Sequence, residues 1–228
     1  MNNTYEYDKY IEKIIRGDST DFIDLRIQMY LKNKLKKNTY NIYYPYNDSE
    51  KVIFYVDSIP IINLYEIKTN IKLSHQDIMG TLYSIGINPS MYGDILIIND
   101  HYYIYILNRY ENYFLSNLTT IKNTKVILSK CDNNLLINYK REYDNIEFVT
   151  SSLRIDNIVS HICHTNRDSA LKKIKGKEVL VNYDYPKNSY SLKENDVFSI
   201  RKFGKYKFIK ITNQTKKGKF IIEIYKYK

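Results

Sequence analysis

The sequence contains no tryptophan and only two cysteines, Cys131 and Cys163, which lie far apart and match neither a zinc-ligand spacing nor a disulfide framework. No run approaches the roughly 20 apolar residues that cross a bilayer, and no basic stretch followed by an apolar one opens the chain. An amphipathic anchor carrying Trp is also missing. These absences predict a cytoplasmic protein without a metal site and without a membrane partner.

Motifs that carry catalysis are missing as well. No G-x-G-x-x-G loop follows an expected strand, and none of the common nucleophile or metal motifs occurs. His161 and His164 flank Cys163, but three such residues without a second cluster are more typical of a packed thiol than of a reactive site. The sequence therefore favours a non-catalytic protein without a cofactor.

Positive charge is concentrated in the last third of the chain. The net charge is +10, yet residues 1–148 hold 17 Lys and Arg against 18 Asp and Glu, whereas residues 149–228 hold 18 against 7. A concentrated positive face attracts polyanions and gives salt-dependent binding through counterion release. A solvated basic tail is the alternative, but the basic residues are interleaved with apolar periodicity, which is typical of a folded domain.

Periodicity predicts a small α/β unit over residues 1–70. A first helix is expected over 7–15, and a second over 22–35, starting at Thr20-Asp21. Alternating apolar residues then predict strands over 41–44, 51–56 and 61–67.

A second α/β unit is expected over residues 71–148. Ser74 and Asp77 have capping-box spacing, so Asp77 is expected to cap the helix that ends at Gly86 rather than to act as a catalytic acid. Asn99-Asp100 between two alternating runs predicts a hairpin. The remaining pattern predicts a helix over 109–118, a strand over 125–128 and a connection over 131–145.

The last unit, residues 149–228, is expected to place two helices on a sheet. The first helix is marked by an apolar stripe of Ile155, Ile158, Val159 and Ile162. Thr165 or Asn166 is expected to cap a second helix from Arg167 to Ile174, which Gly176 ends. Strands are expected over 178–181, 197–201, 206–211 and 219–225.

The residues of this unit resemble the S-four RNA-binding domain. That family's pattern runs Arg-Leu-Asp, Ser-Arg-Ser-x-Ala, Ile-x-x-Gly-x-Val-x-Val-Asn and Gly-Asp. Matching segments occur in the same order at Arg154–Asp156, Arg167–Ala170, Ile174–Asn182 and Asn195-Asp196. Asn195 replaces the usual glycine, and asparagine also tolerates a left-handed turn.

The earlier part of the chain resembles the YlmH family of bacterial proteins, which is related to the ribosome quality control factor RqcP. The resemblance rests on Thr20–Asp24, Ser74–Gly80, Gly93–Ile95 and the junction Val149–Arg154. It implies an α+β protein of three small α/β domains: an N-terminal domain (1–70), an RNA-recognition-motif-like domain (71–148) and an S-four, or αL-motif, RNA-binding domain (149–228).

The resemblance also implies a function. It predicts a monomeric, cytoplasmic, non-catalytic protein that binds structured rRNA and tRNA on the large ribosomal subunit, with an RqcH-type tailing factor as a partner in the quality control of stalled nascent chains. A cell-division interaction protein is one alternative. An rRNA-modifying enzyme is another, because Arg154-Ile155-Asp156 superficially resembles the active-site motif of pseudouridine synthases.

The predicted RNA contacts are basic side chains of the last unit. Arg167 begins the second helix, where its guanidinium and the helix amides can bind phosphate together. Arg154 is expected to contact RNA and also to pair with Asp156 or Asp168. The further predicted contacts are Lys172, Lys173, Lys175, Lys177 and Asn182, with a second cluster on the same side formed by Arg201, Lys202, Lys205 and Lys207.

Overall fold

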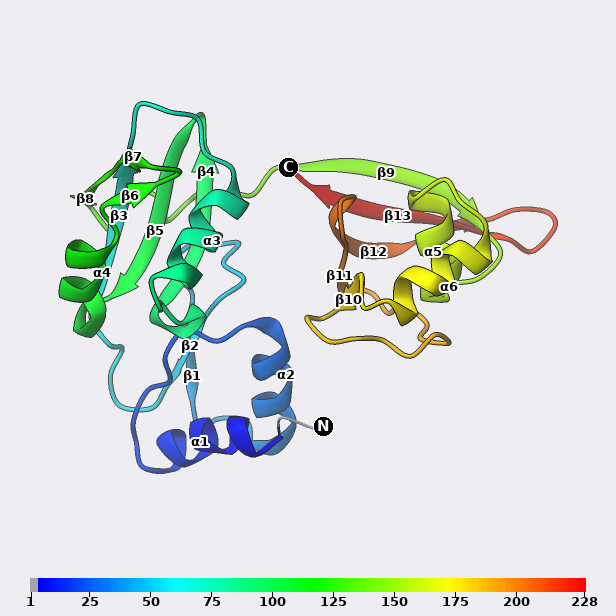
Figure 1. The fold of residues 1–228 in the computed structure, drawn as a ribbon. Helices are drawn as coiled ribbons and strands as arrows, with labels where there is room; N and C mark the ends of the chain where they lie inside the picture. The colour runs from blue at the N-terminus through cyan, green and yellow to red at the C-terminus, as the bar shows by residue number, and fades with distance from the viewer. Residues whose placement is uncertain (1–3) are drawn as a thin grey trace. The chain divides into compact units, whose positions relative to one another are not determined.

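The computed structural model describes residues 4–228, and the side chains from Tyr7 onward. The chain forms two compact units, one up to residue 140 and one from residue 141 (Figure 1). Both units mix helices with sheets, which confirms the expected α+β class. None of the helices within residues 4–228 is long and apolar enough to cross a membrane.

The first unit opens with two helices and a short two-stranded sheet: α1 (Thr4–Ile15), α2 (Leu25–Lys34), β1 (Asn41–Tyr43) and β2 (Ile53–Tyr55). The expected start of α2 at Thr20-Asp21 is wrong. Asp24 caps this helix, since its carboxylate accepts from the Ile27 backbone N–H at 3.0 Å. The Thr20 hydroxyl instead accepts from the Phe54 N–H at 3.0 Å, which ties the preceding segment to β2.

A four-stranded antiparallel sheet follows in the same unit. Its strands are β3 (Ile62–Lys68), β4 (Tyr92–Ile98), β5 (His101–Leu107) and β8 (Ile127–Cys131), in the order β4-β5-β3-β8. With α3 (His75–Ser84) and α4 (Glu111–Asn117), the chain order is β-α-β-β-α-β, a split β-α-β arrangement. Two short helical turns (Pro89–Met91, Asn108–Tyr110) and a small hairpin, β6 (Thr120–Ile121) with β7 (Thr124–Lys125), complete the unit.

The predicted capping box and the predicted hairpin turn are both present in this part of the chain. Ser74 and Asp77 form the reciprocal capping box at the start of α3. Asn99 and Asp100 both adopt positive φ, 49° and 62°, in the tight turn between β4 and β5. Asp77 is therefore a helix cap, as predicted.

The two faces of the four-stranded sheet pack against different parts of the chain. One face meets α3 and α4 through Tyr65, Ile67, Ile78, Leu82 and Phe114. The opposite face packs Leu64 and Tyr105 against Phe22, Tyr46 and Leu136, which come from outside the sheet. The domain boundary expected at residue 70 therefore falls after the first strand of the sheet, and the two domains expected before residue 148 lie in one compact unit.

The second unit places two helices on one face of a five-stranded antiparallel sheet (Figure 1). The sheet order is β10-β11-β12-β13-β9, and its core joins Ile158, Val159 and Ile174 of the helices to Phe208 and Ile222 of the sheet. The bounds are β9 (Tyr143–Thr150), α5 (Ile155–Ile162), α6 (Arg167–Lys175), β10 (Val179–Val181), β11 (Val197–Ile200), β12 (Gly204–Gln214) and β13 (Phe220–Tyr227).

Strand β9 differs from the expectation of a connection over 131–145. It pairs with β13 along its whole length, from Tyr143 opposite Tyr227 to Thr150 opposite Phe220. The boundary expected at 148/149 thus falls inside a strand, and the compact unit begins near residue 141.

Candidate nucleic-acid interface

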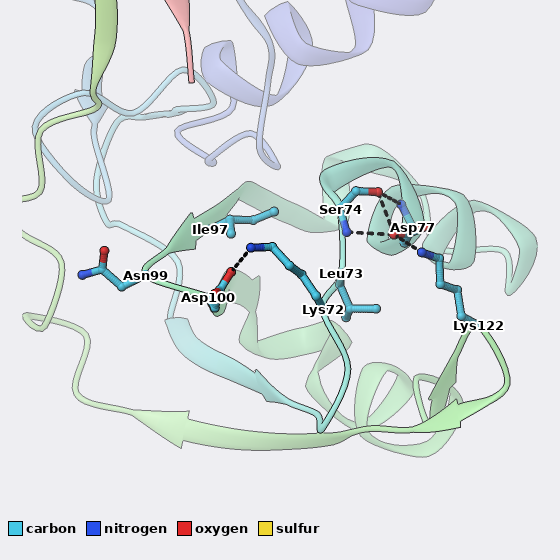
Figure 2. Close-up of a pocket in the computed structure, with 8 residues that line it drawn as sticks. All are labelled: Lys72, Leu73, Ser74, Asp77, Ile97, Asn99, Asp100 and Lys122. Carbon is cyan, nitrogen blue, oxygen red and sulfur yellow. Dashed lines mark hydrogen bonds and ion pairs between the residues drawn. The ribbon is translucent and has the colours of Figure 1, made fainter.

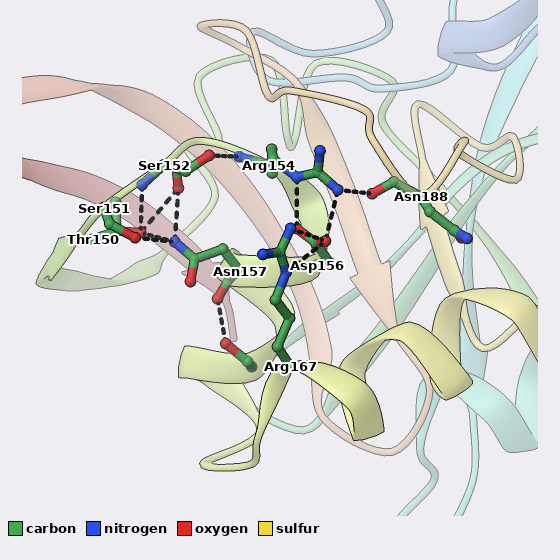
Figure 3. A network of polar contacts seen from close by, with 9 residues as sticks. Thr150, Ser151, Ser152, Arg154, Asp156, Asn157, Arg167 and Asn188 are labelled. Carbon is green, nitrogen blue, oxygen red and sulfur yellow. Dashed lines mark hydrogen bonds and ion pairs between the residues drawn. The ribbon is translucent and has the colours of Figure 1, made fainter.

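A buried carboxylate joins the two arginines that the sequence singles out. Asp156 is fully buried, and its Oδ2 accepts from Arg154 Nη2 at 2.9 Å and from Arg167 Nη2 at 2.9 Å and Nε at 3.0 Å (Figure 3). Arg154 Nε also donates to Asp156 Oδ1 at 3.2 Å. The structure thus gives Arg154 the ion pair with Asp156, not with Asp168, and adds Arg167 to the same carboxylate.

The Asp156 carboxylate is ionised in this setting. Burial opposes its ionisation, but hydrogen bonds from Arg154 and Arg167 outweigh burial and hold the pKa of the carboxyl below its ordinary value. Two guanidinium groups share one negative charge, so the group of three carries a net charge of one positive unit. The Arg167 side chain remains 58% exposed and the Arg154 side chain 38% exposed, so both can also face a ligand.

Polar contacts fix the start of α5, which has no side-chain cap. The Asn157 amide donates to Thr150 Oγ1 at 2.6 Å and to the Ser152 carbonyl at 3.1 Å, while the Arg154 N–H donates to Ser152 Oγ at 3.1 Å (Figure 3). These contacts join the end of β9 to the helix. They set the position from which Arg154 reaches Asp156.

The lysines of α6 and of the turn after it differ in the contacts that they already make within the fold. Lys172, Lys175 and Lys177 are exposed. Lys173 pairs with Glu178 at 3.0 Å and lies 5.5 Å from the Phe203 ring centre. Its charge is therefore largely satisfied within the fold, in contrast to the charge of its neighbour Lys172.

Asn182 is held by the fold on both sides of its amide. It adopts φ of 50°, its Nδ2 donates to Asp196 Oδ1 at 2.8 Å, and its Oδ1 accepts from the Val197 N–H at 3.0 Å. Asn195, at φ of 69°, takes the left-handed conformation expected of it. These contacts tie the turn after β10 to the start of β11, so Asn182 has a structural role here.

The second predicted cluster is divided between a turn and a sheet face. Arg201 and Lys202 are exposed in the turn between β11 and β12. In β12, Tyr206 and Phe208 point into the helix-covered core, so the alternating Lys205 and Lys207 point to the opposite face. The expectation that this whole cluster lies on the side of the helices is therefore wrong. Lys205 instead donates to Tyr183 Oη at 2.8 Å.

The histidine and cysteine group at the end of α5 has no activated thiol. Burial raises the pKa of Cys163, the opposite of what a thiolate nucleophile needs. The His161 ring stacks on Phe148 with ring centres 4.8 Å apart. Cys163 packs against the core of the unit, as the sequence predicts, whereas His161 and His164 remain exposed.

A pocket of the first unit is lined by charges that neutralise one another. Lys72 pairs with Asp100 at 2.9 Å, and Lys122 pairs with Asp77 at 2.7 Å (Figure 2). The hydrogen bonds from Lys122 and Ser74 lower the pKa of Asp77 to about 2. Because each of these two lysines has a carboxylate partner, the pocket offers little net attraction to phosphate. Its other lining residues are Leu73, Ser74, Ile97 and Asn99.

The face of the four-stranded sheet that lies opposite its helices is covered over much of its area. Phe22 and Tyr46 pack on it, and Tyr46 stacks on Tyr105 with ring centres 6.1 Å apart. RNA-recognition domains stack bases on aromatic side chains of such a sheet. At its more exposed end, His101 pairs with Glu66 at 2.6 Å, so an acidic group lies where phosphate would approach.

Part of the first unit is similar to a known protein family. Residues 59–134, which contain the whole four-stranded sheet, match the family model described as "Putative RNA-binding domain in YlmH". The chain is 24% identical over 234 residues to "Ribosome-associated protein quality control protein P2" of Bacillus subtilis (strain 168), covering 96% of this chain and 91% of that protein. The resemblance to the YlmH family is thereby confirmed.

A solved structure is also similar. It is "Cell division protein ylmH from Streptococcus pneumoniae", with 21% sequence identity and a TM-score of 0.49, covering 59% of this chain and 92% of that chain.

The β12–β13 hairpin carries three exposed lysines that are not among the predicted RNA contacts: Lys216, Lys217 and Lys219. Their sequence signal is Lys216-Lys217-Gly218-Lys219 between two strands, where glycine is typical of a tight turn that exposes its neighbours.

Proposed function

We propose that this chain is a non-catalytic, cytoplasmic RNA-binding protein that associates with ribosomes. Its second unit acts as an S-four-type domain that binds structured rRNA or tRNA on the large subunit during quality control of stalled nascent chains. The name of its Bacillus relative and the RNA-binding family match support ribosome-associated RNA binding. An RqcH-type tailing factor is the proposed protein partner.

The observation that carries this proposal is the pair of arginines on buried Asp156. The carboxylate holds both guanidinium groups in place, so less side-chain entropy is lost when they bind a ligand. Arg167 is the first residue of α6, where backbone N–H groups add favourable partial charge for a phosphate. Exposed Lys172 and Lys175 follow on the same helix.

Folded RNA suits this surface better than a specific base sequence. Arginine and lysine contacts to phosphate position a protein but read no bases. Duplex RNA is recognised mainly through its shape and backbone. Together with the covered sheet face of the first unit, this supports placing the main RNA contact of our proposal in the second unit.

A pseudouridine synthase role for Arg154-Ile155-Asp156 is disfavoured by geometry. A catalytic carboxylate must reach the base, but Asp156 is fully buried and both of its oxygens accept hydrogen bonds from arginine. The motif serves to hold the arginines.

Sedimentation of the tagged full chain in cell lysate, at low and moderate salt, tests the proposal. The wild type is expected to travel with large subunits, and an Arg167→Glu, Lys172→Glu variant to stay at the top of the gradient. A variant with the same charge change in the first unit, Lys32→Glu, Lys36→Glu, is the control and should sediment like the wild type. If the wild type also stays at the top at every salt concentration, the ribosomal function is wrong, and a division-partner function becomes the one to test.

A further inference from the structure

The hairpin of β12 and β13 extends well beyond β11, and its turn lies beyond the end of β9. β11 pairs only with the first part of β12, up to Lys207, and β9 ends at Thr150, opposite Phe220. β12 and β13 remain paired as far as Gln214 and Phe220. Residues 215–219, here called the hairpin tip, therefore project past both neighbouring strands, as the orange-to-red loop in Figure 1 shows.

The hairpin tip is a formed turn rather than an open loop. The Thr215 N–H donates to the Lys219 carbonyl at 2.8 Å, and the Gly218 N–H donates to the Thr215 carbonyl at 2.9 Å. Thr215 Oγ1 accepts from the Lys219 N–H at 3.1 Å, and Gly218 supplies the positive φ of 73° that the turn requires. Phe220 packs against the core at its base. These hydrogen bonds thus fix the backbone that carries the lysines of the tip.

The hairpin tip carries positive charge that the fold leaves uncompensated. Lys216, Lys217 and Lys219 are exposed, and none of the three forms an ion pair with the residues that the structure describes. The nearest acidic side chain along the hairpin, Glu223, already pairs with Lys210 at 3.8 Å. The charge of the tip is therefore available to an anionic ligand.

The hairpin tip lies at the same end of the unit as the start of α6. At the base of the tip, Thr150 lies opposite Phe220 and accepts from Asn157 Nδ2 at 2.6 Å. The residue before Asn157 is Asp156, whose Oδ2 accepts from Arg167 Nη2 at 2.9 Å. The tip and Arg167 are therefore linked through the start of α5.

We propose that the hairpin tip is a second RNA-binding element, in which Lys216, Lys217 and Lys219 contact backbone phosphates of a double-helical RNA whose adjoining segment Arg167 holds. This inference rests on the proposed function of the same unit. The tip has no aromatic side chain on which an unpaired base could stack, as proteins that bind single strands use. A duplex offers two rows of phosphates, which suits two separate groups of cations at one end of the unit.

Binding of the full chain to a labelled RNA stem-loop, measured across a salt series, tests this element. A Lys216→Gln, Lys217→Gln, Lys219→Gln variant should lose about tenfold or more in affinity at moderate salt, and its salt slope should fall by about 2 to 3. The matched control is Lys32→Gln, Lys36→Gln, Lys37→Gln, which removes the same charge from exposed positions of the first unit and should bind like the wild type.

The outcomes separate this inference from the proposed function. If the tip variant binds like the wild type while Arg167→Ala loses affinity, the tip is not an RNA-binding element and the proposed function stands. If neither variant changes affinity, both are wrong. An unstructured single strand of the same length that binds as tightly as the stem-loop would overturn the assignment to double-helical RNA.

Discussion

At the scale of single residues, Asp156 brings together two arginines that stand at the starts of two successive helices. The sequence predicts that Arg154 pairs with Asp156 or Asp168 but cannot choose between them, because both carboxylates lie within reach of a helix start. The two carboxylates differ in burial, since Asp156 points into the unit whereas Asp168 is exposed, and Arg154 pairs with the buried one. A buried carboxylate needs compensating charge, and the two arginines supply it.

Replacing Asp156 by Asn should destabilise the second unit. The variant leaves two guanidinium groups without their shared counter-charge, and we expect a loss of about 1–3 kcal/mol in the free energy of unfolding. Hydrogen exchange across residues 155–175 measures the opening of this unit separately from the first. Asp168→Asn, at an exposed position, should cost less than about 1 kcal/mol. Equal effects of the two changes would contradict the structural role given to Asp156.

The same carboxylate should make stability depend on pH in the acidic range. The pKa of Asp156 is lower in the folded chain than the ordinary value of about 3.9, so its stabilisation is fully present above that pH. It is lost as the pH falls through the lowered folded pKa, when the carboxyl takes up a proton. The difference in unfolding free energy between wild type and Asp156→Asn should therefore shrink as the pH is taken from 5 toward the acid limit of folding. A difference that stays constant over this range would show that Asp156 does not titrate as described.

Two further residues show where prediction from residue type alone stops. Lys173 is predicted as an RNA contact because it is a cation of the second helix, and Asn182 because it belongs to the S-four pattern. In the fold, Lys173 pairs with Glu178, and the Asn182 amide locks a turn with Asp196 and Val197. Such partners become visible only when distant strands are brought together.

At the scale of elements, strand β9 is hard to predict because one of its faces is exposed and partly polar. Its inward residues Ile146, Phe148 and Thr150 alternate with the exposed polar residues Asn145 and Glu147. Because polar residues also begin the strand and Asn-rich residues 132–140 precede it, the sequence predicts a connection here. The helices α5 and α6, by contrast, are predicted well, because an apolar stripe and the Asn166 cap are both local signals.

Gly93 in strand β4 leaves room for the Phe22 ring, which packs against the strand. A Cβ atom on Gly93 would lie 3.1 Å from the Phe22 ring and 3.2 Å from Tyr105 Cβ, and both of those side chains are buried. Gly93→Ala should therefore lower the free energy of unfolding of the first unit by about 1–3 kcal/mol, through overpacking. Hydrogen exchange of the β3 and β5 amides is the measurement.

Gly80→Ala is the matched control for that change. Gly80 lies within α3, and an added Cβ would meet nothing within 4 Å, so alanine should stabilise the unit by about 0.5–1 kcal/mol through its higher helix propensity. Opposite signs for the two substitutions are the expected result. If Gly93→Ala were neutral or stabilising, the close packing of Phe22 on the sheet would be wrong.

At the scale of the whole molecule, the sequence predicts the α+β class, most helices and strands, and the concentration of basic residues in the last third. It does not predict that Phe22 and Tyr46 cover a sheet formed by residues 62–131, because that packing joins segments with no local signal for each other. This covering matters for function. Because this sheet face is covered, the proposed function places the main RNA contact on the second unit, with its arginine pair and hairpin tip.

The most direct test of this account is the affinity of the full chain for purified large ribosomal subunits, measured against salt concentration for the wild type and for Arg167→Ala. We expect salt-dependent binding by the wild type, and for the variant a weaker affinity with a slope of log affinity against log salt reduced by about one. Wild-type binding that does not respond to salt, or a variant with unchanged affinity and slope, would contradict the claim that the second unit grips RNA phosphates through Arg167.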